Sequence, residues 1–141
     1  RLEDWQSIRD VINETEDPFN ILINIFQHCP RTKTDTNIYK KDTWLNGWQL
    51  IEKNEYDLVD ISLLVSYTIL LTDNFKDHDL KIHTVYTKED SSNNQKFSYI
   101  IEMENSLIDI YSMAKLNKST FDKNYILQYT THIRELINTK N

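Results

Sequence analysis

Residues 57–71 read DLVDISLLVSYTILL, and this stretch decides which fold the sequence predicts. Apolar side chains recur in it every three or four residues, the spacing that places them along one side of an α-helix. That stripe comprises Leu58, Ile61, Leu64, Val65, Thr68 and Leu71. Other apolar residues widen the stripe, so most of the helix surface is suited to burial. We expect this helix to begin after Asp57, whose carboxylate can accept from the first amides, and to form the centre of the core.

Two helices are predicted at the N-terminal end of the chain. The first covers residues 2–13, and the second begins at Asp17 and Pro18, a hydrogen-bond acceptor followed by a residue with a preset φ. Pro30 ends the second helix near His28. The stripe that the first helix buries comprises Leu2, Trp5, Ile8 and Ile12. The second helix is apolar on nearly all sides, which predicts that it is buried or covered by a partner.

A polar, locally basic stretch at residues 31–41 is typical of a surface loop. A third helix is predicted after this loop, beginning at Asp42 or Thr43. Its apolar face comprises Trp44, Leu45, Trp48 and Ile51. Gly47 lies inside the helix and should weaken it by about 1 kcal/mol relative to alanine, unless close packing requires a glycine there.

The sequence pattern changes after residue 79. Two stretches rich in β-branched and aromatic residues, 80–88 and 96–103, flank a turn-forming stretch at 89–95. Strands have this composition, and the short polar interval between the two stretches predicts a β-hairpin.

Two more helices are predicted after the hairpin. One starts at Asn105 or Ser106, and the last starts at Ser119, which stands three residues before Asp122 at capping-box spacing. Their apolar residues are Leu107, Ile110, Tyr111 and Ala114 in the former, and Tyr125, Tyr129, Ile133 and Leu136 or Ile137 in the latter. The sequence thus predicts a mainly α fold of the α+β class, with about six helices around a central apolar helix and one β-hairpin near residues 80–103. All 141 residues are expected to form a single domain.

The scarcity of glycine and cysteine excludes several classes of protein. Gly47 is the one glycine of the chain, whereas dinucleotide-binding folds and P-loops each need at least two to approach phosphates closely. The single cysteine, Cys29, cannot form an internal disulfide, and no apolar stretch approaches the ~20 residues that span a bilayer. We therefore expect a soluble, intracellular domain that has no cofactor and no membrane partner.

Acidic residues near the N-terminus and two tryptophans are the predicted protein-binding residues. The formal net charge of the chain is −6, and Glu3, Asp4 and Asp10 concentrate negative charge in the first helix. Trp44 and Trp48 share one face of the third helix, and tryptophan is enriched in binding hot spots. These features predict a non-catalytic domain that binds a basic protein, for example an inhibitor or immunity-type protein. A solvated acidic surface beside buried tryptophans is the alternative explanation.

A divalent-metal-dependent phosphoester hydrolase is the second hypothesis. Its candidate metal ligands are Asp77, His78, Asp79 and His83, with Glu52, Glu55 and Asp60 as a second group. Imidazole and carboxylate groups are the usual ligands of zinc, magnesium and manganese. A charged turn and an exposed corner between helices explain the same residues without a metal.

Nucleic-acid binding is the third hypothesis and rests on the basic loop Arg31–Lys41 beside the tryptophans. The negative net charge opposes this hypothesis, because affinity for nucleic acids depends on Lys and Arg neutralising phosphates. We therefore expect nucleic acid to be a less favoured partner than protein.

Overall fold

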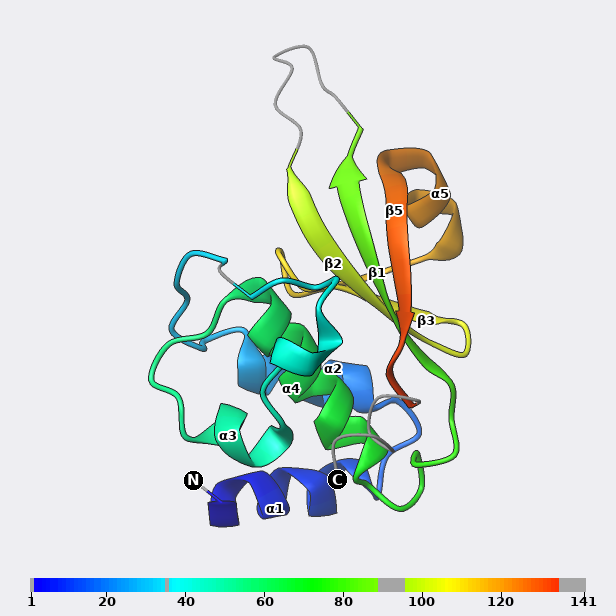
Figure 1. Cartoon of the computed structure of the whole chain (residues 1–141). Coiled ribbons are helices and arrows are strands. Elements are labelled where there is room, and N and C mark those ends of the chain that lie inside the picture. Colours follow the sequence, from blue (N-terminus) through cyan, green and yellow to red (C-terminus); the bar gives the residue numbers. More distant parts are fainter. Residues whose placement is uncertain (1, 35, 89–95, 135–141) are drawn as a thin grey trace.

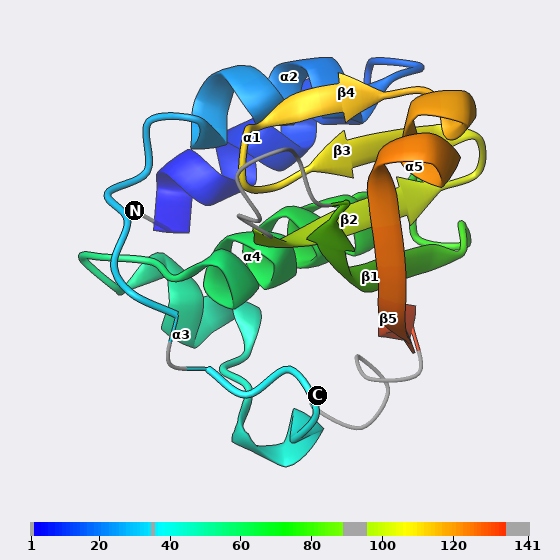
Figure 2. The same ribbon diagram turned by 90° about the horizontal axis from the view of Figure 1, so that it is seen from above.

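The computed structural model describes residues 2–34, 36–88 and 96–134. The elements in chain order are α1 (Leu2–Ile12), α2 (Pro18–Phe26), the 3₁₀ helix η1 (Lys41–Thr43), α3 (Gly47–Ile51), α4 (Leu58–Leu70), β1 (Leu80–Thr87), β2 (Phe97–Met103), β3 (Ser106–Asp109), β4 (Ala114–Leu116), α5 (Lys118–Asn124) and β5 (Tyr125–His132). Helix α4 packs against one face of a five-stranded sheet, with α1, α2 and α3 around it (Figure 1). Seen from above, the short helix α5 lies on the opposite face (Figure 2).

The five strands follow the order β4-β3-β2-β1-β5, and each neighbouring pair is antiparallel. β1 and β2 form the predicted hairpin, in which Leu80 pairs with Met103 and Tyr86 pairs with Phe97. The other side of β1 pairs with β5, so the hairpin is the middle of a larger sheet.

The predicted fold class, mainly α with about six helices and a single hairpin, is wrong. The described residues form five α-helices and one five-stranded sheet. Residues 106–116, which were expected to be helical, form β3 and β4 instead. Their apolar residues do not alternate, because Ile108 faces the main core while Leu107 belongs to a smaller cluster around Phe121 of α5. A strand that is covered on both faces loses the period of two by which strands are recognised.

The last predicted helix is wrong over most of its length. Asn117, rather than Ser119, caps the seven-residue helix α5, and its side chain accepts from the Thr120 amide at 2.7 Å. From Tyr125 onward the chain is extended, because β5 gains a ladder of backbone hydrogen bonds with β1 that a short, isolated helix cannot match. Leu136 and Ile137 lie outside the described residues.

Helix α4 is the central element that the sequence predicts. Every residue from Val59 to Leu70 is buried, including serine and threonine residues whose hydroxyls donate to the carbonyls four residues earlier. Asp57 caps the helix by accepting from the Asp60 amide at 2.7 Å, and the Asp60 carboxylate accepts from the Asp57 amide. Even α4 does not reach the length required of a membrane span, and no other helix among the described residues does so.

The N-terminal helices begin largely as predicted, but the third is shorter. Asp17 accepts from the Phe19 amide at 3.1 Å and so caps α2. α3 begins only after Asn46, whose side chain and that of Gln49 each accept from the other's backbone amide at 2.9 Å. Trp44 therefore lies between η1 and α3, and the expected helical face shared by Trp44 and Trp48 does not form.

Gly47 stands where α3 lies closest to α1. A Cβ atom added at this position would lie 2.7 Å from Cη2 of the Trp5 ring, closer than van der Waals contact permits. Close packing against a fixed ring therefore explains why a glycine occupies the first turn of α3.

We predict that Gly47→Ala destabilises the protein by about 1 to 3 kcal/mol, because the overpacked methyl outweighs the gain of about 1 kcal/mol in helix propensity. Urea unfolding of both proteins measures the difference. In a Trp5→Phe background the outer ring atoms are absent, so the same substitution should cost less. An equal cost in both backgrounds would rule out the Trp5 contact as the cause.

Candidate protein-binding site

An apolar pocket of about 270 Å³ opens between α1, the end of α2, the end of α3 and α4. Its apolar wall comprises Trp5, Ile8, Phe26, Ile51, Tyr56 and Leu64, and the other lining residues are Asp4, Cys29, Pro30, Lys53 and Asn54. We call this hollow the α1–α4 pocket. An apolar wall with a few polar groups at its margin is the usual composition of a binding site.

The Trp5 ring is a fixed part of the pocket wall. It is buried, and its indole nitrogen donates to the Thr68 hydroxyl of α4 at 2.8 Å. The Arg9 guanidinium lies 4.9 Å from the ring centre, in a cation–π arrangement. Asp4 and Ile8 stand one helical turn apart, so they line the same side of the pocket as Trp5.

Trp48 is an exposed tryptophan next to this wall. Half of its surface is open to solvent (51%), and its ring meets that of Trp5 edge to face, with centres 5.1 Å apart. Trp48 also stands one turn before Ile51, which lines the pocket. Large exposed aromatic side chains beside an apolar hollow are typical of binding hot spots.

Trp44, the other predicted binding tryptophan, lies inside the fold. It is 2% exposed, and its indole nitrogen donates to the Asn37 carbonyl at 3.0 Å. The structure thus separates the two tryptophans, with Trp48 on the surface and Trp44 inside the fold.

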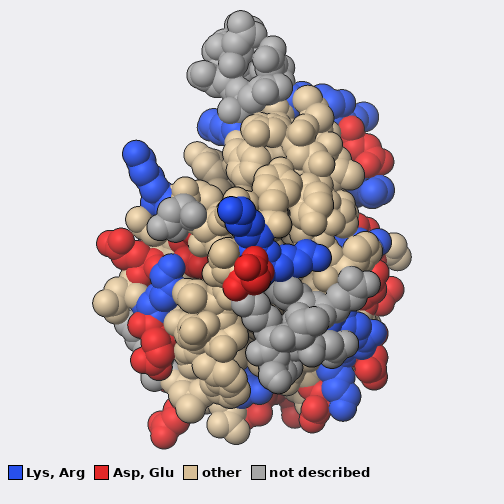
Figure 3. All heavy atoms as spheres, in the orientation of Figure 1, with Lys and Arg blue, Asp and Glu red and all other residues tan. Residues whose placement is uncertain are grey.

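The predicted acidic residues of α1 are all exposed, but the structure brings only some of them to the pocket. Asp4 lines the α1–α4 pocket, and Glu3 precedes it on the same turn. Asp10 lines a separate polar hollow with Arg9, Asn13 and other residues. Asp and Glu side chains predominate along the lower edge of the face shown in Figure 3, where α1 lies in Figure 1.

Burial shifts the pKa of Cys29, which lines the pocket, and of Asp60, which pairs with the lining residue Lys53. Burial raises the pKa of the Cys29 thiol, although the positive charge of Arg31 opposes this shift. The Lys53 ammonium forms an ion pair with Asp60. Burial raises the pKa of the Asp60 carboxyl, and the hydrogen bond from Lys53 acts in the opposite direction.

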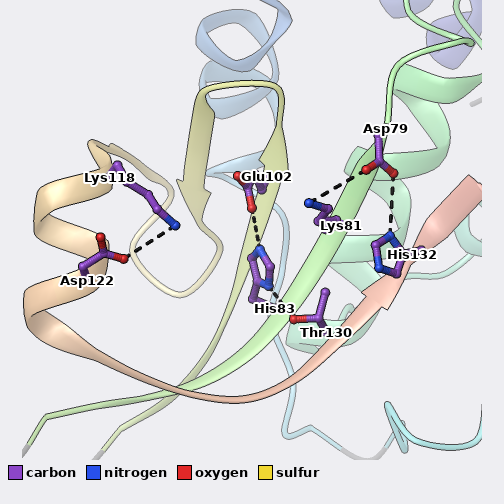
Figure 4. A network of polar contacts seen from close by, with 8 residues as sticks. All are labelled: Asp79, Lys81, His83, Glu102, Lys118, Asp122, Thr130 and His132. Atoms are coloured by element: carbon purple, nitrogen blue, oxygen red, sulfur yellow. Dashed lines mark hydrogen bonds and ion pairs between the residues drawn. The ribbon is translucent and has the colours of Figure 1, made fainter.

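The predicted metal ligands have separate partners. Asp77 pairs with Arg134 at 3.2 Å, His78 lies 3.1 Å from a Glu104 oxygen, and Asp79 approaches both Lys81 and His132 within 4 Å. Figure 4 shows Asp79 and His83 engaged with different neighbours. Across the described parts of the chain, no three His, Cys, Asp or Glu side chains converge closely enough to hold a metal ion.

His83 joins three strands on the sheet face that α5 covers. Its Nε2 lies 2.7 Å from Oε1 of Glu102 on β2, and its Nδ1 lies 2.8 Å from the Thr130 hydroxyl on β5 (Figure 4). The ring is 8% exposed and meets Phe121 edge to face. Desolvation lowers the pKa of His83, and the hydrogen bond to Glu102 only partly offsets this effect. The imidazole therefore links β1 to both of its neighbours.

Arg31 and Asp60, two of the remaining predicted residues, form contacts that stabilise the fold. Arg31 donates to the carbonyls of Tyr111 and Ile110 at 2.7 and 3.2 Å, which ties the start of the basic loop to the segment after β3. In the acidic group near α4, Asp60 is buried in the helix cap, whereas Glu52 and Glu55 are exposed.

The α1–α4 pocket itself was not predicted from the sequence. Trp5 and Ile8 were expected to face the core. The spacing of apolar residues within one helix shows which side is buried, but the hollow depends on how four elements meet. No local signal in residues 51–56 indicated that they would complete it.

Comparison of the chain with protein-family models, with curated proteins and with solved structures finds no match in any of the three.

We predict that the Cys29 thiol reacts slowly with a thiol reagent near neutral pH, because its raised pKa leaves little thiolate. The reaction rate should rise with pH through an apparent pKa above that of an unstructured cysteine peptide. Cys29 is the only cysteine, so Cys29→Ser provides a blank for the assay. A midpoint at or below that of the peptide would contradict the burial of this thiol.

We also predict that stability falls on acidification because of His83. Its pKa is lower in the folded protein than in the unfolded chain, so the unfolded chain takes up the proton first as the pH drops. The free energy of unfolding should decrease below the ordinary histidine pKa of about 6.5. His83→Gln should weaken this dependence, measured by urea unfolding across pH 5 to 8. His28→Gln, at an exposed histidine, is the control, and an equal effect of both variants would contradict the prediction.

Proposed function

We propose that this chain is a non-catalytic protein-binding domain whose α1–α4 pocket receives an apolar side chain of a basic partner protein. The observation that carries this proposal is the position of one exposed tryptophan, Trp48, and one exposed carboxylate, Asp4, beside the same apolar hollow. Each of these features is common alone. Together they form a surface with an anchor pocket, an aromatic contact and a charged margin.

The size of the pocket favours a side chain over a larger cofactor. Small-molecule sites usually measure about 300 to 1,000 Å³. The α1–α4 pocket, at about 270 Å³, lies just below that range and fits one anchoring residue. Anchors of this kind, seated in preformed apolar pockets and surrounded by weaker contacts, supply most of the binding energy in protein interfaces.

The charge around the pocket favours a basic partner. Glu3 and Asp4 stand on the first turn of α1. Lys53 is the one basic residue among the described residues of the lining, and it pairs with Asp60. The net charge of −6 attracts a basic protein over longer distances and increases the association rate at low ionic strength. An inhibitor or immunity-type role, in which the domain covers a basic surface of another protein, would use these features.

A reducing, intracellular compartment is part of the same proposal. It is supported by the chemistry of Cys29, a free thiol in the wall of the binding pocket. Oxidation of this thiol would place a polar group where the anchor side chain is expected to sit. No arrangement among the described residues gives comparable support to the metal-dependent hydrolase hypothesis.

The test begins with affinity capture from a native lysate at low and moderate salt, with four tagged proteins in parallel. The wild type and the control Val11→Ala, which alters an exposed α1 residue outside the pocket, should retain the same partner. Trp48→Ala and Asp4→Lys should lose it. With the purified partner, Trp48→Ala should weaken binding at least tenfold, which corresponds to about 1.4 kcal/mol.

Cys29 then reports directly on the occupancy of the pocket. Saturating partner should slow the reaction of this single thiol with a thiol reagent, because the anchor side chain covers it. A partner that binds equally to the wild type, Trp48→Ala and Asp4→Lys, and leaves the thiol reaction unchanged, would show that binding occurs elsewhere and would refute the proposal.

A further inference from the structure

The two edges of the sheet differ in length. At one edge, β4 has three residues and lies beside α2 (Figure 2). At the other edge, β5 has eight residues, and no strand among the described residues pairs with its outer side. An edge strand of this length presents backbone donors and acceptors that can form a ladder with another strand.

The sequence of β5 lacks the charges and proline that commonly protect an edge strand. It reads YILQYTTH, without Lys, Arg, Asp, Glu or Pro. Ile126 and Leu127 are 40% and 53% exposed. Figure 3 shows the upper end of the sheet as an area with few charged side chains. Natural proteins normally place charges or proline on exposed edges to prevent pairing, so the composition of β5 favours pairing.

Long-range hydrogen bonds fix β5 in place. The Tyr125 hydroxyl donates to Oδ2 of Asp109 on β3 at 2.6 Å, and the Thr130 hydroxyl bonds to His83 on β1 at 2.8 Å. Asp109 is buried, and it also accepts from the Ser98 hydroxyl at 2.6 Å. A strand anchored in both halves is a preformed template, which reduces the entropy lost when another strand pairs with it.

We propose that β5 pairs with the β5 strand of a second copy of this chain, antiparallel and about a two-fold axis. Two-fold pairing brings the same strand of each copy together, so a strand whose charges are all of one sign would repel its own copy. β5 has no Lys, Arg, Asp or Glu and avoids this repulsion. The charge pattern that would mark a different, oppositely charged partner strand is also absent from it. The product is a continuous ten-stranded sheet.

The shape of β5 predicts that this association is weak. Val85 pairs with Leu127 but Thr84 pairs with Tyr129, so Gln128 is an extra residue that forms a bulge. The bulge divides the ladder into two short runs and increases the local twist. We expect a dissociation constant in the micromolar range, typical of small interfaces. None of the described residues that line the α1–α4 pocket lies on β5.

Sedimentation equilibrium of the full chain from low micromolar to several hundred micromolar concentration tests the proposal. The wild type should show a reversible monomer–dimer equilibrium. Leu127→Lys and Leu127→Glu should each weaken dimerisation at least tenfold, because each places like charges on paired edges. Val11→Lys adds the same charge at an equally exposed position of α1 and should leave the dimer intact.

Mixing the two charged variants gives the decisive result. Leu127→Lys and Leu127→Glu, each weakened in dimerisation alone, should form a heterodimer when mixed, because the two paired edges then carry opposite charges. Circular dichroism and urea unfolding confirm that both variants remain folded. A wild type that stays monomeric at all concentrations would overturn the proposal. A dimer that survives both charged variants, or a mixture that stays monomeric, would also overturn it.

Discussion

Helix α4 has almost no side open to solvent, since each residue from Val59 to Leu70 is buried. A helix of this kind is stable only when other elements surround it, because its apolar surface is too large for water and its own propensity is insufficient. The sheet covers one side, and α1, α2 and α3 cover the rest. Its serine and threonine hydroxyls bond back to the helix, so the burial leaves few polar groups to satisfy elsewhere. The positions of Trp5 and Gly47, and hence the α1–α4 pocket, follow from packing around this helix.

The sheet face that α5 covers is stabilised by a small apolar cluster together with buried hydrogen bonds. Phe121 of α5 covers a small apolar cluster, and a buried polar group lies on each side of it. His83 links β1 to β2 and β5, while Asp109 accepts hydrogen bonds from Ser98 and Tyr125. Buried hydrogen bonds specify one register, because a shift by one residue would leave their partners unpaired. The main core thus provides most of the apolar burial, and the polar groups define where β5 lies.

The sequence predicted the elements that have one dominant pattern. Local patterns of residue spacing or capping predicted α1, α2, α4 and the β1–β2 hairpin, and the structure contains each of them. β3 was missed because burial on both of its faces removes the alternation that identifies a strand. β4 has only three residues, and the spacing of Tyr125, Tyr129 and Ile133 in and after β5 also fits a helix. The candidate site was predicted only in part. Asp4 and Trp48 were identified by charge and aromatic character, but the burial of Trp44 and the pocket itself depend on contacts between distant segments.

The pairing of β1 with β5 has a consequence for how the chain acquires its structure during synthesis. β1 and β2 emerge early and can form their hairpin at once, whereas the outer side of β1 has no partner until residues 125–132 have left the ribosome. During that interval β1 exposes backbone groups that can pair with other nascent chains. The hydrogen bonds of His83 with Thr130 and of Asp109 with Tyr125 also form only after β5 has been synthesised. The sheet therefore reaches its final strand order late. Slow translation of this last segment would prolong the aggregation-prone state, and a chaperone that shields β1 would shorten it.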